Sequence, residues 1–100
     1  MSVSKGKYRT YDLEQLPKKG DRVKVVEKSV VDNMVDSVGK HTYKWNGNDL
    51  CLSFNEYMDE FCGREFTVLE VDTVTGQFTL DGATFNDQNW WFCLDFVELL

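Results

Sequence analysis

The sequence predicts a single, mainly β domain of about five strands with one short helix. Two dipeptides that favour tight hairpin turns, Asn46-Gly47 and Asp81-Gly82, lie beside runs of alternating apolar residues. The glycines are scattered, with about one for each expected turn. A length of 100 residues suits one domain, and an aromatic fraction of 14% can form a compact core from few side chains.

The net charge of −6 is unevenly distributed along the chain. Residues 1–28 contain eight basic and four acidic side chains, whereas residues 29–100 contain three basic and thirteen acidic ones. We expect a single domain over residues 1–100, with a flexible basic tail at residues 1–10. The acidic remainder disfavours nucleic acid as a partner and favours a basic protein surface.

Cysteine usage and hydropathy indicate a cytoplasmic protein. The three cysteines, Cys51, Cys62 and Cys93, are odd in number and widely spaced, which favours reduced thiols over a disulfide framework. The N-terminus lacks the apolar run of a signal peptide. No stretch approaches the ~20 apolar residues of a membrane-spanning helix, so we expect no membrane segment.

The first strand follows a turn. Pro17 ends any preceding helix, and residues 18–21 have a turn composition. Val23 and Val25 alternate with polar residues in the strand predicted at residues 22–28. The apolar spacing then becomes helical, which predicts a second short helix at about 30–38. A long irregular loop is the alternative for this segment.

Residues 40–53 are predicted to form a hairpin around Asn46-Gly47, because a type I′ turn needs positive φ at both positions. Counting outward from the turn pairs Trp45 with Asn48, Lys44 with Asp49, and Tyr43 with Leu50. The opposite charges of Lys44 and Asp49 support this register. One face then contains His41, Tyr43, Trp45, Leu50 and Leu52.

The clearest helix is predicted at about 54–62. Ser53 and Glu56 have the spacing of a capping box, and Gly63 suits the left-handed residue after a helix end. Apolar residues at intervals of three and four form one stripe, consisting of Phe54, Tyr57, Met58 and Phe61.

The remaining chain is predicted to be β-structure. The alternation of the strand at residues 64–72 breaks between Val68 and Leu69, which indicates a bulge. A turn at Thr75-Gly76, a strand at 77–80 and a hairpin turn at Asp81-Gly82 follow. Further strands are expected near 83–85, at 90–94 and at 97–100.

Two terminal segments resemble SH3-like barrels. Residues 18–25 (Lys-Lys-Gly-Asp-Arg-Val-Lys-Val) resemble the opening of their first long strand. Residues 94–99 (Leu-Asp-Phe-Val-Glu-Leu) resemble the short helical turn and last strand that close them. The chain departs from the eukaryotic peptide-binding modules, because their early aromatic motif is absent and Trp90-Trp91 lies close to the C-terminus.

A second resemblance covers residues 54–99. This region is similar to small SH3-like proteins encoded by bacteriophages and mobile elements of Gram-positive bacteria. The shared order is a short helix ending at Gly63-Arg64, a strand, a hairpin, Trp90-Trp91-Phe92 and a closing Phe96. The resemblance implies an SH3-like barrel of about five strands in a phage or mobile-element setting.

Neither a metal site nor catalysis is expected from the motifs. His41 is the only histidine, and no two cysteines have the two-to-four-residue gap of a zinc knuckle. Nucleophilic catalysis would need a cysteine or serine beside His41 with an orienting acid, but no elbow motif surrounds a candidate. The sequence therefore predicts a non-enzymatic protein with no cofactor, metal ligand or catalytic residue.

Aromatic residues are the first candidates for binding. Trp90 and Trp91 are adjacent, so on a strand they point to opposite faces, one towards the core and one outward. Trp45, with Tyr43 on the same face, is hard to bury at a hairpin tip, and exposed tryptophans are common hot spots. Coverage of these rings by residues 8–16 is the alternative.

Carboxylates are the second candidates. A row of acids can imitate a phosphate backbone, although a merely solvated face is the alternative. The row in residues 32–65 consists of Asp32, Asp36, Asp49, Glu56, Asp59, Glu60 and Glu65.

These observations lead to one hypothesis about function. We expect a non-enzymatic, protein-binding accessory protein of a phage or mobile element that inhibits a host factor or defence system. The binding residues would be Tyr43, Trp45, Glu56, Asp59, Glu60, Trp90 and Trp91. The alternative is an SH3-like barrel that binds a small ligand or nucleic acid. Both a monomer and a homodimer are compatible with the sequence.

Overall fold

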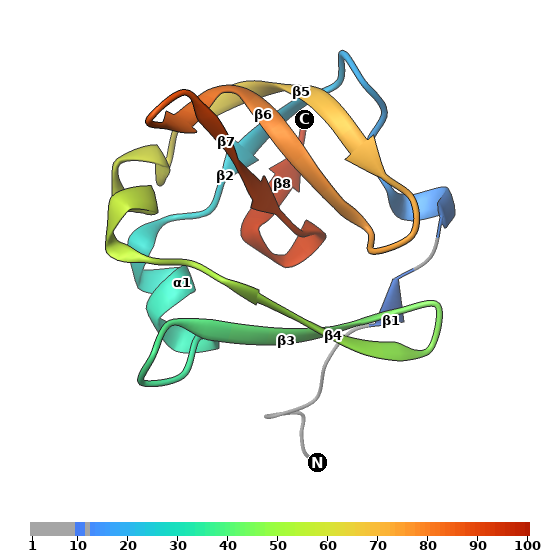
Figure 1. The fold of residues 1–100 in the computed structure, drawn as a ribbon, viewed down its shortest axis with the longest axis horizontal. Helices are drawn as coiled ribbons and strands as arrows, with labels where there is room; N and C mark the ends of the chain where they lie inside the picture. Colours follow the sequence, from blue (N-terminus) through green and yellow to red (C-terminus); the bar gives the residue numbers. More distant parts are fainter. Residues whose placement is uncertain (1–9, 12) are drawn as a thin grey trace.

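The computed structural model describes residues 10–11 and 13–100. The described chain forms a five-stranded and a three-stranded sheet with four short helical segments (Figure 1), which confirms the predicted mainly β domain. The predicted basic tail lies outside the described residues except for Thr10. The elements are β1 (Thr10–Tyr11), η1 (Leu13–Gln15), β2 (Arg22–Val25), α1 (Lys28–Met34), β3 (Lys40–Trp45), β4 (Asn48–Ser53), η2 (Glu56–Phe61), β5 (Glu65–Asp72), β6 (Gln77–Phe85), β7 (Gln88–Phe92), η3 (Leu94–Phe96) and β8 (Val97–Leu99).

The larger sheet has the order β7-β6-β5-β2-β8, and all neighbouring strands are antiparallel. Val23 in β2 pairs with Phe66 on one side and Leu99 on the other. The strand that opens the sheet therefore pairs with the strand that closes it. The one-turn helix η3 directly precedes β8. This arrangement agrees with the SH3-like barrel that the sequence predicts.

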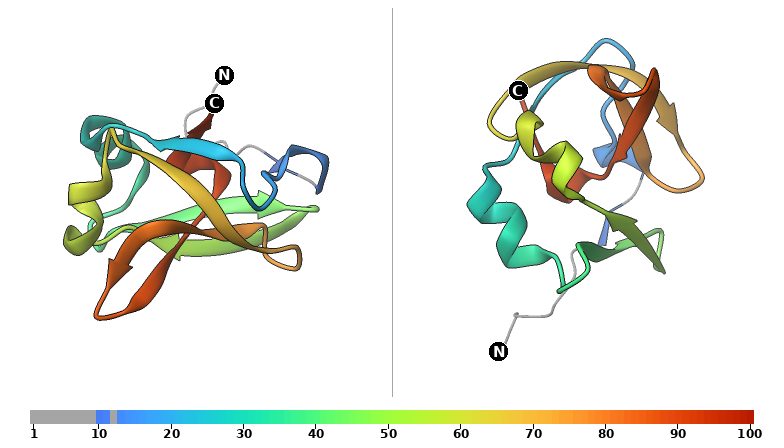
Figure 2. Two further views of the ribbon diagram at one scale, coloured as in Figure 1. Left: turned by 90° about the horizontal axis from the view of Figure 1, so that it is seen from above. Right: turned by 60° about the vertical axis from the view of Figure 1, so that its left-hand side comes forward.

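A long insertion between β2 and β5 contains α1, the β3–β4 hairpin and η2. Figures 1 and 2 show that α1 and η2 lie side by side at one end of the molecule, while the hairpin runs across the open side of the larger sheet. An ion-pair contact of 4.0 Å between Lys28 and Asp59 joins the two helices.

The predicted second helix is present but displaced. It spans Lys28–Met34 rather than about 30–38. The chain turns soon after Met34, where the side chain of Asp36 accepts hydrogen bonds from the backbone N–H groups of Val38 and Lys40, both at 2.9 Å. Gly39 adopts a φ of 81° in this turn. A side chain that binds the backbone in this way competes with continued helix.

The β3–β4 hairpin has the predicted register. Trp45 pairs with Asn48, Lys44 with Asp49, and Tyr43 with Leu50. Asn46 and Gly47 both have positive φ, and Lys44 and Asp49 form an ion pair at 2.5 Å. The parallel strand β1 extends this sheet along β3.

The prediction of a hairpin turn at Asp81-Gly82 is wrong. Both residues lie inside β6, and the chain reverses at Asn86-Asp87, where φ is 52° and 64°. The pairing of β6 with β7 shifts between Thr79 and Thr84, and Gly82 has a φ of 97° within this irregular stretch. The glycine therefore bends a long strand. The bulge predicted after Val68 is confirmed by a register shift between Val68 and Glu70.

The helix predicted at about 54–62 is a shorter 3₁₀ helix, Glu56–Phe61. Ser53 ends β4, and Asn55 caps the helix by accepting the N–H of Tyr57 at 2.9 Å. The predicted capping box is therefore wrong. A 3₁₀ helix has about three residues per turn, so the apolar residues that would form one stripe on an α-helix no longer share a single face. Met58 and Phe61 are buried, whereas Tyr57 is 52% exposed.

The insertion is anchored to the larger sheet by two aromatic side chains. Trp45 donates its indole N–H to the carbonyl of Thr73 at 3.1 Å, and Tyr43 donates its hydroxyl to the carbonyl of Thr75 at 2.7 Å. A Cβ at Gly76 would lie 2.5 Å from the Trp45 ring. The hairpin therefore packs on the turn between β5 and β6.

Gly76→Ala tests this packing. We expect a loss of about 2–4 kcal/mol in the free energy of unfolding, because overpacking costs about 1–3 kcal/mol and a left-handed alanine adds about 1 kcal/mol. Urea unfolding followed by tryptophan fluorescence measures the loss. Gly47→Ala is the matched control, since Gly47 has a φ of +83° but nothing within 4 Å of an added Cβ. Equal losses for the two variants would contradict the proposed Trp45 packing.

Candidate functional site

Three aromatic side chains form a partly exposed cluster where the insertion meets the β6–β7 hairpin. The rings of Tyr57 and Phe85 are 4.8 Å apart between centroids, and those of Phe85 and Trp90 are 6.1 Å apart. Tyr57 is 52% exposed, Phe85 is 43% exposed and Trp90 is half-buried. Adjacent exposed rings of this kind offer a large apolar contact area.

Strand pairing and helix type explain why these rings meet. Phe85 pairs with Gln88 across the β6–β7 hairpin, so Trp90, two residues further on, lies on the same face of the sheet. The 3₁₀ geometry of η2 turns Tyr57 out of the core and towards Phe85. The cluster thus combines one ring from the insertion with two from the larger sheet.

Two carboxylates accompany the cluster. Glu56 and Glu60 are exposed residues of η2, on either side of Tyr57. Residues three apart in a 3₁₀ helix eclipse one another, so Tyr57 and Glu60 share a face. Among the described residues, no basic group lies within ion-pair distance of either glutamate. The site therefore combines aromatic area with uncompensated negative charge.

Most of the other acids of the predicted row form ion pairs or hydrogen bonds with neighbouring residues. Lys28 contacts Asp32 at 2.6 Å and Asp59 at 4.0 Å. Lys44 pairs with Asp49 and Arg22 with Glu65, and the N–H groups of Lys40 and Val38 lower the pKa of the Asp36 carboxyl. These contacts favour a local acidic site at Glu56 and Glu60 over one continuous acidic face.

The structure therefore groups only some of the predicted binding residues. Trp90, Glu56, Asp59 and Glu60 lie on the neighbouring elements β7 and η2. Tyr43 and Trp45 are 1% and 2% exposed, so the expectation of an accessible ring at the hairpin tip is wrong. Their burial follows from packing against the β5–β6 turn.

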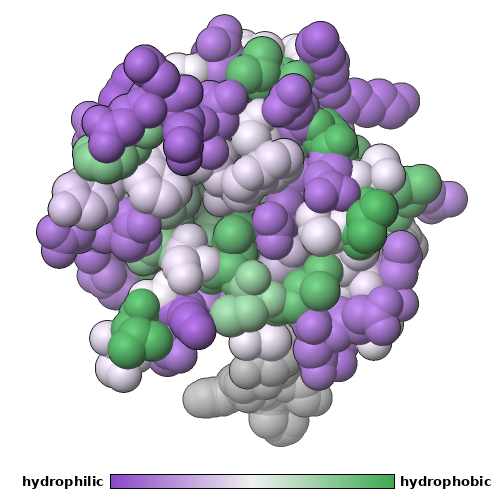
Figure 3. Space-filling view, in the orientation of Figure 1, coloured by the Kyte–Doolittle hydropathy of each residue, from purple (hydrophilic) through white to green (hydrophobic). Residues whose placement is uncertain are grey.

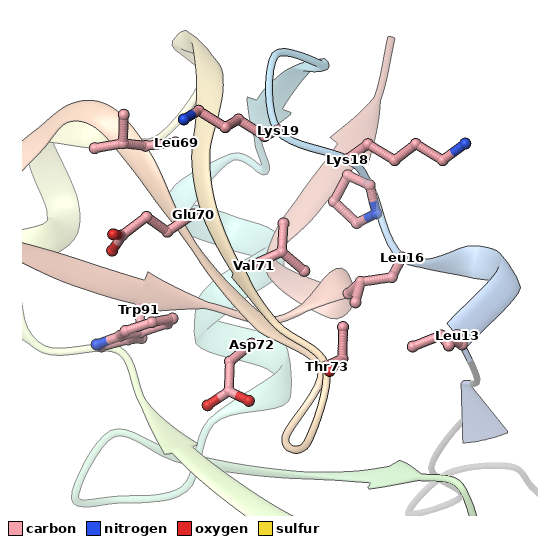
Figure 4. A pocket seen from close by; sticks show the side chains of 11 residues that line it. Leu13, Leu16, Lys18, Lys19, Leu69, Glu70, Val71, Asp72, Thr73 and Trp91 are labelled. Atoms are coloured by element: carbon pink, nitrogen blue, oxygen red, sulfur yellow. The ribbon is translucent and has the colours of Figure 1, made fainter.

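Trp91 lies apart from the aromatic cluster, beside an open groove of about 800 Å³. Trp91 is 38% exposed, so it is the outward-facing member of the tryptophan pair. Figure 4 shows Trp91 and Glu70 on one side of β5, with Leu13 and Leu16 on the other. Figure 3 shows apolar residues scattered across the middle and right of one face, with hydrophilic residues around them.

Sequence reasoning missed two residues of the aromatic cluster. The sequence predicts Tyr57 in a buried helical stripe, and Phe85 in a short strand after a turn at Asp81-Gly82. A signal for Phe85 was present, because Asn86-Asp87 is itself a pair of residues that tolerate positive φ. No comparable signal existed for Tyr57, since the choice between an α and a 3₁₀ helix depends on the surrounding fold.

The chain matches no protein-family model, none of the curated protein sequences and no solved structure. Its function must therefore be inferred from its own residues and geometry. None of the described helices is both long enough and apolar enough to cross a membrane.

The three cysteines differ in their surroundings. Cys51 is exposed, Cys62 is half-buried and Cys93 is buried. Burial raises the pKa of the Cys93 thiol to about 12, and the neighbouring Asp95 carboxylate adds to this shift. Burial also raises the pKa of Cys62. Because the thiolate is the nucleophilic form, Cys93 is a poor nucleophile even though His41 and Asp95 are close to it.

Thiol labelling tests these differences. We expect iodoacetamide to modify Cys51 first, Cys62 more slowly and Cys93 only after unfolding, as measured by mass spectrometry of digested peptides. In Cys51→Ser, Cys93 should remain unmodified in the native protein. If Cys93 were labelled in the native protein as fast as Cys51, its thiol would be accessible to solvent and the prediction would be wrong.

Proposed function

We propose that this chain is a non-enzymatic protein-binding domain whose site is the cluster of Tyr57, Phe85 and Trp90 with Glu56 and Glu60. The main support is the meeting, on adjacent elements, of closely spaced, partly exposed rings with two carboxylates that have no ion-pair partner among the described residues. Large rings supply most of the binding energy in many protein interfaces, and exposed clusters of them are uncommon on surfaces without a partner.

The chemistry of the site favours a partner segment that contains arginine or lysine. A guanidinium group can stack on an aromatic ring and also bind a carboxylate through two hydrogen bonds. The net charge of −6 would draw a basic partner towards the domain. An acidic partner or a nucleic-acid backbone would be repelled by the same carboxylates.

The state of Trp90 adds support. Its indole N–H is buried and has no hydrogen-bond acceptor among the described residues. An unsatisfied buried donor destabilises a protein by about 1–3 kcal/mol. A role of the Trp90 ring in binding would explain why tryptophan stands at this position despite the loss of stability.

The resemblance to small SH3-like proteins of phages and mobile elements supports the proposed setting. There the domain would act in the cytoplasm as an accessory protein that occupies a basic surface of a host factor or defence protein. The compact fold, with few elements beyond the barrel and its insertion, suits such a binding role.

Peptide titration tests the proposed site. Peptides of equal length that are rich in arginine, in lysine or in glutamate are titrated into the full chain while tryptophan fluorescence is recorded. We expect binding of the arginine-rich peptide, weaker binding of the lysine-rich peptide and none of the acidic one. Tyr57→Ala and Phe85→Ala should each weaken binding about tenfold or more, since truncating a hot-spot ring costs about 2 kcal/mol.

Charge variants complete the test. Glu56→Gln with Glu60→Gln should weaken binding and reduce its dependence on salt. Glu98→Gln is the matched control, because Glu98 is exposed and, among the described residues, unpaired, but lies in β8. Unchanged affinity in the ring variants with preserved circular dichroism, or no binding of basic peptides at all, would refute the proposal.

A small-ligand site is the second candidate function, favoured by the groove beside Trp91. Its apolar walls include Leu16 and Val71, and Lys18 and Lys19 also line it. An exposed indole can stack on a planar ligand such as a nucleotide, and the lysines would attract its phosphate, although Glu70 and Asp72 also line the groove. This site lies apart from the aromatic cluster, so the two functions can be tested separately.

Titration with nucleotides and short oligonucleotides tests the groove. If the groove binds them, the tryptophan fluorescence should change with saturation, and Trp91→Phe should remove most of the change. Tyr57→Ala is the control that should leave this signal intact. A lack of saturable change with any nucleotide would eliminate this class of ligand.

A further inference from the structure

Three potential metal ligands converge inside the molecule, away from both surfaces described above. They are His41 in β3, Cys93 directly before η3, and Asp95 in η3, and their ligand atoms all lie within 4.8 Å of one another. The Nε2 atom of His41 is 2.7 Å from a carboxylate oxygen of Asp95. The side chains of His41 and Asp95 are only 7% and 12% exposed.

The orientation of the imidazole ring is informative. Its Nδ1 atom is 3.3 Å from the backbone carbonyl oxygen of Met34, and a carbonyl oxygen can only accept a hydrogen bond. When the neutral ring carries its hydrogen on Nδ1, that nitrogen donates to Met34 and the Nε2 lone pair faces the Asp95 carboxylate. In this tautomer two metal-ligating atoms face one another, and a cation between them would satisfy both. In the other tautomer, Nε2 donates its hydrogen to Asp95.

We propose that His41, Cys93 and Asp95 form a Zn²⁺ site. Imidazole nitrogen, thiolate sulfur and carboxylate oxygen are the three protein donors that zinc uses, and three of them leave a fourth position for water. Histidines that bind metals usually donate their other N–H to a carbonyl or carboxylate, and Nδ1 of His41 is 3.3 Å from such an acceptor, the carbonyl oxygen of Met34. The partial exposure of Asp95 gives the ion an approach from solvent.

Binding would replace protons with the metal ion. The Cys93 thiol would lose its proton to solvent as the Zn–S bond forms, and any proton held between Nε2 and Asp95 would leave in the same way. No oxidant or other reactant is needed. Because His41 belongs to the insertion and the other two ligands lie just before the closing strand β8, the ion would link these two parts of the fold.

Cobalt substitution is the direct test. Co²⁺ is titrated into the metal-free full chain, and absorption is recorded for the thiolate charge-transfer band and the ligand-field bands of the tetrahedral ion. We expect saturation at one equivalent, displacement by Zn²⁺, and a melting temperature that rises with Zn²⁺ concentration. A folded chain that takes up neither ion would overturn the proposal.

Variants assign the ligands. Cys93→Ser should abolish the charge-transfer band, and His41→Gln should weaken binding at least tenfold. Asp95→Asn is a second variant, used if replacement of a more deeply buried ligand prevents folding. It should weaken metal binding but keep the thiolate charge-transfer band. Cys51→Ser is the control, since Cys51 is exposed and lies outside the cluster. Loss of the band in Cys51→Ser, but not in Cys93→Ser, would also overturn the proposal.

Discussion

The packing of the β3–β4 hairpin on the turn between β5 and β6 is the contact on which the rest of the structure depends. The Trp45 ring occupies the space beside Gly76, and Tyr43 bonds to the backbone of Thr75. Each contact buries a large ring and satisfies its polar atom, so separating the hairpin from the sheet would lose both gains. Because α1 precedes the hairpin and η2 follows it, this docking also restricts where the two helices can lie.

The binding surface is a consequence of that restriction. The segment η2 leaves the hairpin and reaches the far end of the β6–β7 ribbon, where Tyr57 meets Phe85. Neither the insertion nor the larger sheet would present this cluster alone. The charges add specificity, since most neighbouring acids are paired with lysine or arginine while Glu56 and Glu60 stay available. A partner would therefore meet apolar area and negative charge together.

The internal cluster of His41, Cys93 and Asp95 also joins the insertion to the larger sheet. His41 is in β3, while Cys93 caps the helical turn η3 and Asp95 lies within it, just before the strand that closes the larger sheet. Buried polar groups destabilise a fold unless they are satisfied, and the short contact between His41 and Asp95 gives each of them a partner. The aromatic and the polar contacts thus hold the hairpin at separate points along β3.

The sequence by itself determined the local features. The turn at Asn46-Gly47 and the register around it follow from φ preferences and from charges that act between adjacent strands. Tertiary structure decided the rest, including the role of Asp81-Gly82, where a glycine that would suit a turn instead bends a strand paired with β7. It also buried Trp45 and exposed Tyr57, which reversed their expected roles in the candidate site. Backbone preferences act over a few residues, whereas burial depends on partners that are distant in the chain, and no local pattern specifies those partners.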